Sequence, residues 1–407
     1  MLTLRSLALL LMPALMASAA DLAFVNARII DGSGGPPLED ATLLVHDGRV
    51  QVVGRSVKVP ADARRVDASG KTIIPGLING HGHVNALSQL GLYARYGVTT
   101  VFSLGGDKEV EFRDQTRAQQ QTAALDRARL YIAGHISVAK TPQQGRQDVD
   151  ALAAAKTDIV KFRLDDNLGR TAKMTPDVYT AILDEAHRKG MRVAVHIVTL
   201  ADAKAVLNLG ADYLAHSVRD EEIDGETIAL LKKNRAFYTP TLMREVSTFA
   251  YGETPAFPND PFLLRDGNQT EIVQARDAAF QEKMRNDKAG QWYREHLPVA
   301  MRNLKQVEDS GVPVVMGTDT GPPYRFQGYF EHLELEYMTK AGLTPMQALV
   351  CATSTAARCL HAEDQIGTLS PGKWADLVVL SANPLDDIRN TRKIESVWIA
   401  GNRVPAK

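Results

Sequence analysis

Short apolar runs recur along the middle of the chain, and most are followed by stretches with the polar and apolar spacing of a surface helix. The helix-like stretches include residues 176–189, 200–209 and 220–234. The strand-like runs are TIIPGLI (72–78), VTTVFSLG (98–105), RLYIAG (129–134), DIVKFRL (158–164), MRVAVHI (191–197), DYLAHSV (212–218), AFYTPTL (236–242) and VPVVMGTD (312–319). Eight strands that alternate with helices are typical of a parallel sheet. The pattern therefore predicts an α/β fold, a (β/α)8 or TIM barrel, over residues 72–368.

The two ends of the chain have a different pattern. Residues 21–71 contain short runs rich in Val, Ile and Leu, and Asp47-Gly48 is a hairpin signal between two of them. Similar runs return near the C-terminus, in ADLVVLSANP and IESVWIAGNRV. We therefore expect one small β-sandwich domain built from both termini, residues 21–71 together with 369–407.

One long segment fits neither pattern. Residues 250–268 are irregular, with three Pro and two Gly, and a polar helix candidate follows over 269–310. Two interpretations stay open for this segment. It is an inserted loop and helix near the mouth of the barrel, or a plain excursion over the surface.

The first twenty residues have the three parts of a secretory signal peptide. Arg5 supplies a positive charge, residues 7–16 are almost wholly apolar, and Ala-Ser-Ala-Ala at 17–20 is a small-residue cleavage site. The alternative is a buried N-terminal helix. The apolar run is too short to cross a bilayer comfortably, and no later stretch resembles a transmembrane helix. The sequence thus predicts a secreted protein, in the periplasm, with no membrane insertion after cleavage.

Composition and charge exclude some functions. The 407 residues are 44% hydrophobic and carry a formal net charge of −1, so no basic field would attract nucleic acid.

Cys351 and Cys359 fall in one helix-like segment, about 12 Å apart, too far for a disulfide. We expect both to be buried thiols. Composition leaves open whether the chain forms a homo-oligomer.

The candidate chemistry lies at the ends of the predicted strands, where such barrels carry their active sites. His81 and His83 follow the first strand, and side chains two positions apart in an extended chain point the same way. The other candidates at strand ends are Lys161, His196, His216 and Asp319. Nitrogen and oxygen ligands of this kind suit Zn²⁺. Taken singly, each side chain also fits a solvated strand end, and Asp319 also fits a helix cap.

Two longer motifs give this pattern a family resemblance. PGLINGHGH (75–83) and GTLSPGKWADLVVLSANPL (367–385) resemble the first-strand motif and the returning β segment of the amidohydrolase superfamily. The resemblance is strongest to its imidazolonepropionase-like branch, which includes prolidase-like dipeptidases with a carboxylated lysine. It implies a barrel with a flanking β-sandwich and two divalent metal ions, with Zn²⁺ expected.

The resemblance also implies a role for each ligand. His81, His83 and Asp319 would hold one metal, and His196 and His216 the other. Lys161, carboxylated by CO₂, would bridge them, since an ammonium group cannot ligate a metal. A metal-bridging hydroxide would attack an amide carbonyl, with Asp319 as general acid and base. His135 would donate a hydrogen bond to the developing oxyanion.

The substrate is less sharply indicated. The residues expected near the mouth of the barrel are Arg163, Arg219, Tyr238, Arg244 and His332. A guanidinium group there could pair with a substrate carboxylate, although each Arg also fits a solvated rim. The sequence therefore favours a small-molecule substrate, a dipeptide or an N-acyl amino acid.

Some features differ from the family pattern, and other functions stay open. The family usually has Asp where Asn79 stands. His196 is followed by Ile-Val rather than by small residues, and His216 by Ser-Val-Arg-Asp rather than by a Gly-containing turn. The alternatives are a hydrolase of cyclic amides, lactones or xenobiotic esters and carbamates, and a non-catalytic barrel that serves as a binding module. A binding module would not need six filled ligand positions.

Overall fold

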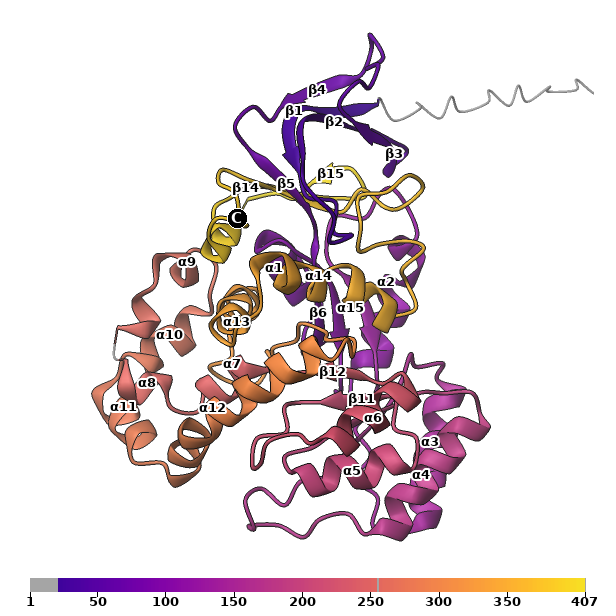
Figure 1. Cartoon of the computed structure of the whole chain (residues 1–407), viewed down its shortest axis with the longest axis vertical. Helices are drawn as coiled ribbons and strands as arrows, with labels where there is room; N and C mark the ends of the chain where they lie inside the picture. Colours follow the sequence, from indigo (N-terminus) through magenta and orange to yellow (C-terminus); the bar gives the residue numbers. More distant parts are fainter. Residues whose placement is uncertain (1–20, 255, 407) are drawn as a thin grey trace, which may run out of the picture.

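The computed structural model describes residues 21–254 and 256–406. The expected signal peptide at 1–20 therefore lies outside the described residues. Strands from both ends of the chain form one eight-stranded sheet in the order β15-β14-β13-β5-β1-β2-β3, and β4 pairs with β1 (Figure 1). These strands are β1 (Leu22–Ile29), β2 (Leu38–His46), β3 (Arg49–Gly54), β4 (Arg64–Asp67), β5 (Thr72–Pro75), β13 (Leu377–Leu380), β14 (Ile394–Ile399) and β15 (Asn402–Arg403).

Local sequence explains the parts of this sheet that were predicted. Asp47 and Gly48 have φ of 46° and 73°, the pair of positive values that a two-residue hairpin between β2 and β3 requires. Antiparallel pairing of β5 with β13 then joins the N-terminal strands to the C-terminal ones. The predicted boundaries of the two domains stay predictions.

Parallel strands form the second part of the α/β fold. They are β6 (Leu77–Gly82), β7 (Val98–Ser103), β8 (Arg129–Ile132), β9 (Val160–Arg163), β10 (Val193–His196), β11 (Tyr213–Ala215) and β12 (Phe237–Thr239). They pair in the orders β6-β7-β8 and β12-β11-β10-β9. All residues of β6, β7, β10 and β11 are buried, as expected for strands covered on both faces.

Single parallel bridges connect these two sheets. Ser137 pairs with Phe162, Tyr238 with Val314, and Thr320 with Gly82. The eighth predicted strand, 312–319, thus contributes bridges rather than a continuous ladder. The first predicted strand is divided, because β5 joins the eight-stranded sheet and β6 the parallel one. The parallel pairing nevertheless returns to β6, an arrangement like that of a TIM barrel.

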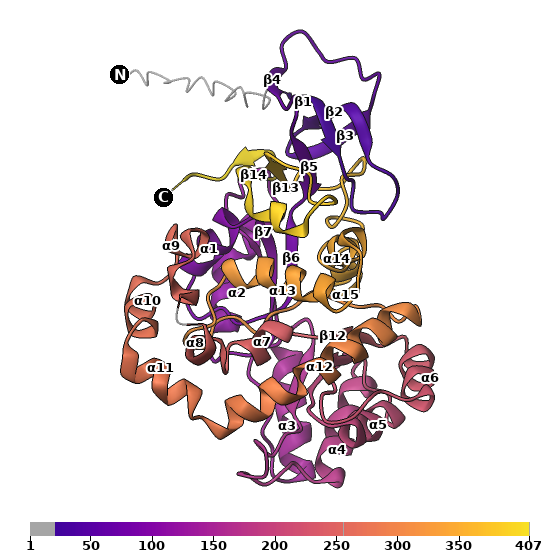
Figure 2. The same ribbon diagram turned by 60° about the vertical axis from the view of Figure 1, so that its left-hand side comes forward.

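Helices surround the parallel strands (Figures 1 and 2). The helices of the described residues are α1 (Ser88–Arg95), α2 (Glu109–Gln120), α3 (Pro142–Ala154), α4 (Pro176–Arg188), α5 (Leu200–Asn208), α6 (Gly225–Asn234), α7 (Leu242–Val246), α8 (Ala250–Glu253), η1 (Phe257–Asn259), α9 (Pro261–Leu264), α10 (Gln269–Ala275), α11 (Ala278–Arg285), α12 (Lys288–Asp309), α13 (Tyr329–Lys340), α14 (Pro345–Cys351), α15 (Ser354–Cys359) and η2 (Ile388–Arg392). None of the helices in 21–254 and 256–406 is long and apolar enough to cross a membrane.

Two predicted helices are interrupted. The single helix expected over 269–310 is wrong, because Asp277 and Asp287 each accept a backbone N–H and begin a new helix, giving α10, α11 and α12. The segment that contains Cys351 and Cys359 is likewise divided into α14 and α15. Both cysteines are free and buried, as predicted.

Candidate metal centre

A cavity of about 270 Å³ lies at the ends of the parallel strands. All six predicted ligand residues line it: His81, His83, Lys161, His196, His216 and Asp319. His81 lies in β6 and His196 ends β10, while His216 directly follows β11. The parallel strands thus bring together residues that are far apart in sequence, as the strand-end argument predicted.

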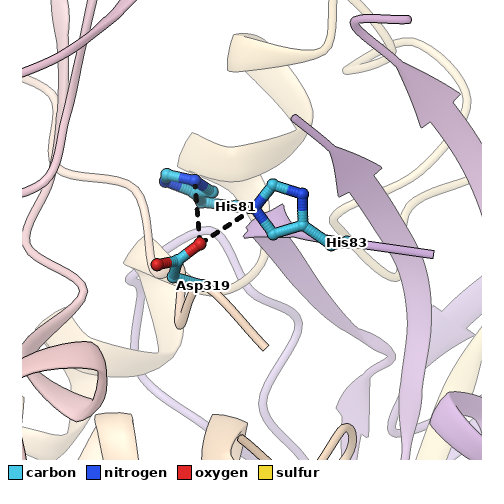
Figure 3. Close-up of side chains that lie close together, drawn as sticks. All are labelled: His81, His83 and Asp319. Atoms are coloured by element: carbon cyan, nitrogen blue, oxygen red, sulfur yellow. Dashed lines mark hydrogen bonds and ion pairs between the residues drawn. The ribbon is translucent and has the colours of Figure 1, made fainter. Parts of the chain in front are cut away.

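His81, His83 and Asp319 form the tightest part of this group (Figure 3). Nε2 of His83 lies 2.9 Å from Oδ1 of Asp319, and Nε2 of His81 lies 3.5 Å from the same oxygen. One ligand atom from each residue lies within 4.8 Å of the others. Close approach of the backbone supports this arrangement, because a Cβ on Gly321 would fall 2.4 Å from the His83 carbonyl oxygen. The three side chains could therefore hold one metal ion.

Hydrogen bonds fix the orientation of three imidazole rings. Nδ1 of His83 lies 2.7 Å from the carbonyl oxygen of Gly105, and Nδ1 of His216 lies 2.7 Å from Oγ1 of Thr241. Nε2 of His196 lies 3.1 Å from Oδ2 of Asp165. Such partners orient a metal-binding histidine and leave its other nitrogen for the metal. These contacts leave Nδ1 of His196 and Nε2 of His216 available to a metal ion.

The imidazole rings lie close enough to share a centre. The ring centroids of His81 and His216 are 4.6 Å apart, and those of His196 and His216 are 4.2 Å apart. Burial lowers the pKa of His196 to about 3 and holds the pKa values of His81 and His216 well below their ordinary value. His81, His196 and His216 are therefore neutral imidazoles near neutral pH, the form that a metal requires.

Lys161 supplies the clearest sign that a group belongs in this cavity. Its Nζ is buried and has no hydrogen-bond partner among the described residues, and the same holds for Nδ1 of His81. Burial lowers the pKa of Lys161 to about 7, so much of the side chain is the neutral amine that CO₂ can carboxylate. Buried polar atoms without partners are rare in proteins. The imidazole and carboxylate groups that line the cavity, together with these two unpartnered nitrogens, fit a divalent metal centre.

Positive charge surrounds Asp319. Arg163, Arg244 and Arg325 all line the cavity, and Nη1 of Arg325 donates to Oδ2 of Asp319. Burial acts to raise the pKa of Asp319, but Arg325 and the neighbouring imidazoles outweigh it and hold that pKa well below its ordinary value. Asp319 is therefore a carboxylate with one oxygen toward the histidines and the other toward Arg325.

The remaining guanidinium groups have their own partners. Nη1 of Arg244 donates to Glu245 at 2.8 Å, and its guanidinium lies 4.2 Å from the ring centroid of Tyr293. Arg163 donates through Nη2 to Oδ2 of Asp165 at 2.6 Å. Asp165 thus contacts both Arg163 and His196.

Sequence reasoning missed Asp165 and Arg325. Asp165 lies two positions beyond the end of β9, so a search for acidic residues just after each strand could have found it. Arg325 carried no such signal, because its position in the loop after Asp319 says nothing about where its side chain points.

Asn79 explains one departure from the family pattern. Its Nδ2 donates to Oε1 of the buried Glu331 at 2.6 Å and to Thr318 at 2.9 Å, and its Oδ1 accepts the backbone N–H of His81. An Asp at this position would bring a second carboxylate against Glu331. The amide holds the His-x-His segment without that repulsion.

Four predicted residues do not line the cavity. His135 is partly exposed, with Nε2 3.8 Å from Asp148, although its neighbour Ile136 reaches the cavity. Arg219 is buried and donates to the Ser217 carbonyl oxygen at 2.8 Å. Tyr238 is buried within β12.

His332 is the clearest correction among these residues. It lies on α13, and both ring nitrogens have partners. Nε2 is 2.8 Å from the Tyr96 carbonyl oxygen, and Nδ1 is 3.0 Å from Oγ1 of Thr391. These contacts indicate that His332 has a structural role, and it does not line the cavity.

Known proteins are similar to this chain in sequence. The sequence profile of the amidohydrolase family matches residues 72–404. An imidazolonepropionase of Streptomyces avermitilis is 25% identical over 416 residues, which cover 92% of this chain and 90% of that protein. An ochratoxinase of Aspergillus niger is 28% identical over 236 residues, 56% of this chain and 41% of that protein.

Solved structures have the same arrangement of elements. A Bifidobacterium longum protein proposed to be a prolidase superposes with a TM-score of 0.75 at 26% identity, over 95% of both chains.

Proposed function

This chain belongs to the amidohydrolase family and is a metal-dependent hydrolase of carbon–nitrogen bonds, and on that premise we propose that it cleaves dipeptides or N-acyl amino acids. The observation that carries this proposal is the cavity itself, where the predicted ligands lie beside Arg163, Arg244 and Arg325. Guanidinium groups pair with carboxylates through two parallel hydrogen bonds. A substrate with a carboxylate near its amide bond could pair with these guanidinium groups.

The metal-binding roles follow from the geometry of the side chains. We assign His81, His83 and Asp319 to one divalent ion, and His196 and His216 to a second. Lys161, as its carbamate, would contact both. When bound, the ions, which we propose to be Zn²⁺, supply Lewis acidity toward the substrate carbonyl and acidify a water molecule.

Asp319 is the residue placed to move protons. Its carboxylate lies in the cavity with Oδ1 toward His81 and His83 and Oδ2 toward Arg325. We propose that it accepts a proton from the attacking water and passes it to the leaving nitrogen, which cannot depart as an amide anion. His135 stays a predicted oxyanion donor, since it lies outside the cavity lining.

The proposal includes the fold and the compartment. We propose that the parallel strands and the bridging segment 312–320 form a complete (β/α)8 barrel over residues 72–368. The strands of 21–71 and 369–407 would form its β-sandwich domain. Export to the periplasm is part of the same proposal and rests on the composition of residues 1–20.

The test is amino acid release from a library of dipeptides and N-acyl amino acids by the mature, Zn²⁺-loaded chain. We expect release from members with a free carboxylate, little release from their amidated counterparts, and none with His81→Ala. A loaded chain that releases nothing from any member would contradict the proposal and shift attention to lactones and cyclic amides. Dependence of activity on added bicarbonate would test the carbamate.

A further inference from the structure

A second cavity, of about 700 Å³, adjoins the candidate metal centre. Its walls come from the loop between β8 and α3, at Val138 and Lys140, and from the loop between β9 and α4, at Met174. Arg163 lines both cavities. A ligand in the second cavity would therefore be separated from the candidate metal ligands only by the side chain of Arg163.

Hydrogen bonds hold the β9–α4 wall in place. Oδ1 of Asp165 accepts the backbone N–H of Asn167 at 2.7 Å, and Oδ1 of Asp166 accepts that of Gly169 at 3.0 Å. Lys173 is held by Asp202, 2.7 Å from its Nζ. The wall is thus built before any ligand arrives, which reduces the entropy lost on binding.

The lining combines apolar surface with positive charge. Val138 is 70% exposed, and Val138 and Val273 are the exposed large hydrophobic residues of the described chain. Met174 and Ala139 add apolar surface and are anchored by packing against the main core. Lys140 is exposed and makes no ion pair with any described residue. An apolar group attached to an anion would satisfy both features.

Arg163 is the guanidinium best placed to receive that anion. Arg244 and Arg325 are buried or nearly so and are engaged by Glu245 and Asp319. The side chain of Arg163 is 44% exposed, and among the described residues its guanidinium group pairs with Asp165 alone, through Nη2. Nε and Nη1 of Arg163 are therefore left for a ligand at the junction of the two cavities.

We propose that the second cavity binds the apolar side chain of the substrate's carboxylate-bearing amino acid, with its carboxylate on Arg163. The inference rests on the proposed function and narrows its substrates to those that release a large apolar or aromatic amino acid. The smaller cavity then holds the scissile amide beside Asp319. One methylene in an apolar pocket changes discrimination by about 10-fold or more, so the preference is measurable.

The test is equilibrium binding of the product amino acids to the Zn²⁺-loaded protein by calorimetry. L-phenylalanine and L-alanine share their backbone groups, so the ratio of their dissociation constants isolates the side chain. We expect L-phenylalanine to bind at least about 10-fold more tightly. Val138→Asp and Met174→Asp should bring that ratio toward one. Val273→Asp, which changes the other exposed valine, should keep the wild-type ratio.

The outcomes separate this inference from the proposed function. A wild-type ratio near one, or a ratio unaltered by Val138→Asp and Met174→Asp, would overturn the assignment of the cavity. Amide cleavage without any preference for large apolar amino acids would overturn the role proposed for the second cavity and leave the proposed function intact. A preference that is lost in Val138→Asp, in a protein that cleaves no amide, would support the cavity and refute the function.

Discussion

Oδ2 of Asp165 lies 3.1 Å from Nε2 of His196 and fixes the face that this imidazole presents to the cavity. Partners of metal-binding histidines contribute strongly to metal affinity. We therefore expect Asp165→Asn to lower Zn²⁺ affinity by about 10–100-fold, measured by titration against a competing chelator. Asp184→Asn, on the exposed face of α4, is the matched control. Equal affinities in wild type and Asp165→Asn would show that this contact does not position a ligand.

Replacement of Asp319 tests the proton transfer role. Asp319→Asn keeps the shape of the side chain but cannot accept a proton, so we expect kcat to fall by about 10²–10⁴-fold. Metal content should change far less, because five other ligand residues remain. Asp126→Asn, at an exposed position, should retain full activity. Retained activity in Asp319→Asn would remove this residue as the general base.

We expect Lys161 to lower the stability of the folded chain and to be required for hydrolysis. Its buried Nζ has no hydrogen-bond partner among the described residues, and such a group destabilises the folded state. We expect Lys161→Met to raise the free energy of unfolding of the metal-free protein by about 1–3 kcal/mol and to abolish hydrolysis. Urea unfolding and activity assays measure the two effects. The surface variant Lys233→Met should change neither, and a destabilised Lys161→Met would mean that the amine has an energetic role in the folded chain.

His332 should matter for stability and not for substrate binding. His332→Ala removes the partner of the buried Tyr96 carbonyl oxygen, so we expect a loss of about 1–3 kcal/mol in unfolding free energy with KM unchanged. Arg163→Gln should have the opposite profile, with a raised KM and unchanged stability. A raised KM in a well-folded His332→Ala protein would restore the prediction that His332 binds substrate.

Glu334 should make stability depend on pH. Burial raises its pKa from 4.5 to about 8, although the backbone N–H groups of Leu242 and Met243 act in the other direction. Below pH 4.5 the carboxyl is protonated in both states and this contribution is fully present. As the pH rises toward 8, the unfolded chain releases the proton first, so stability falls by up to about 1.4 kcal/mol per pH unit.

The measurement for Glu334 is the unfolding free energy across that pH range. Glu334→Gln should flatten the slope, and Glu282→Gln, on the exposed side of α11, should leave it intact. An unchanged slope in Glu334→Gln would assign the pH dependence to other groups.

Local patterns made much of the fold predictable. The Asp47-Gly48 turn and the alternation of apolar runs with amphipathic helices are encoded by neighbouring residues. The six candidate ligand residues, which line one cavity, could be found because parallel strands carry their functional residues at one end. The break of the 269–310 helix was also encoded, in the capping residues Asp277 and Asp287, which the prediction did not use.

Contacts between distant segments were not predictable from pattern alone. His332 was a candidate substrate residue and Asp165 was not, yet His332 contacts the Tyr96 carbonyl oxygen and Asp165 contacts His196 beside the cavity. Which way a side chain points depends on the packing of the whole chain, so the substrate residues were harder to place than the ligands.

Pairing of Pro75 with Leu377 joins segments from opposite ends of the chain. During synthesis on the ribosome, β1 to β5 emerge long before β13, and until then β5 is an edge strand with unpaired backbone groups. Such edges are templates for association between chains. Premature termination or proteolysis before β13 would therefore leave a fragment that aggregates, even if every residue of the metal centre had already been made.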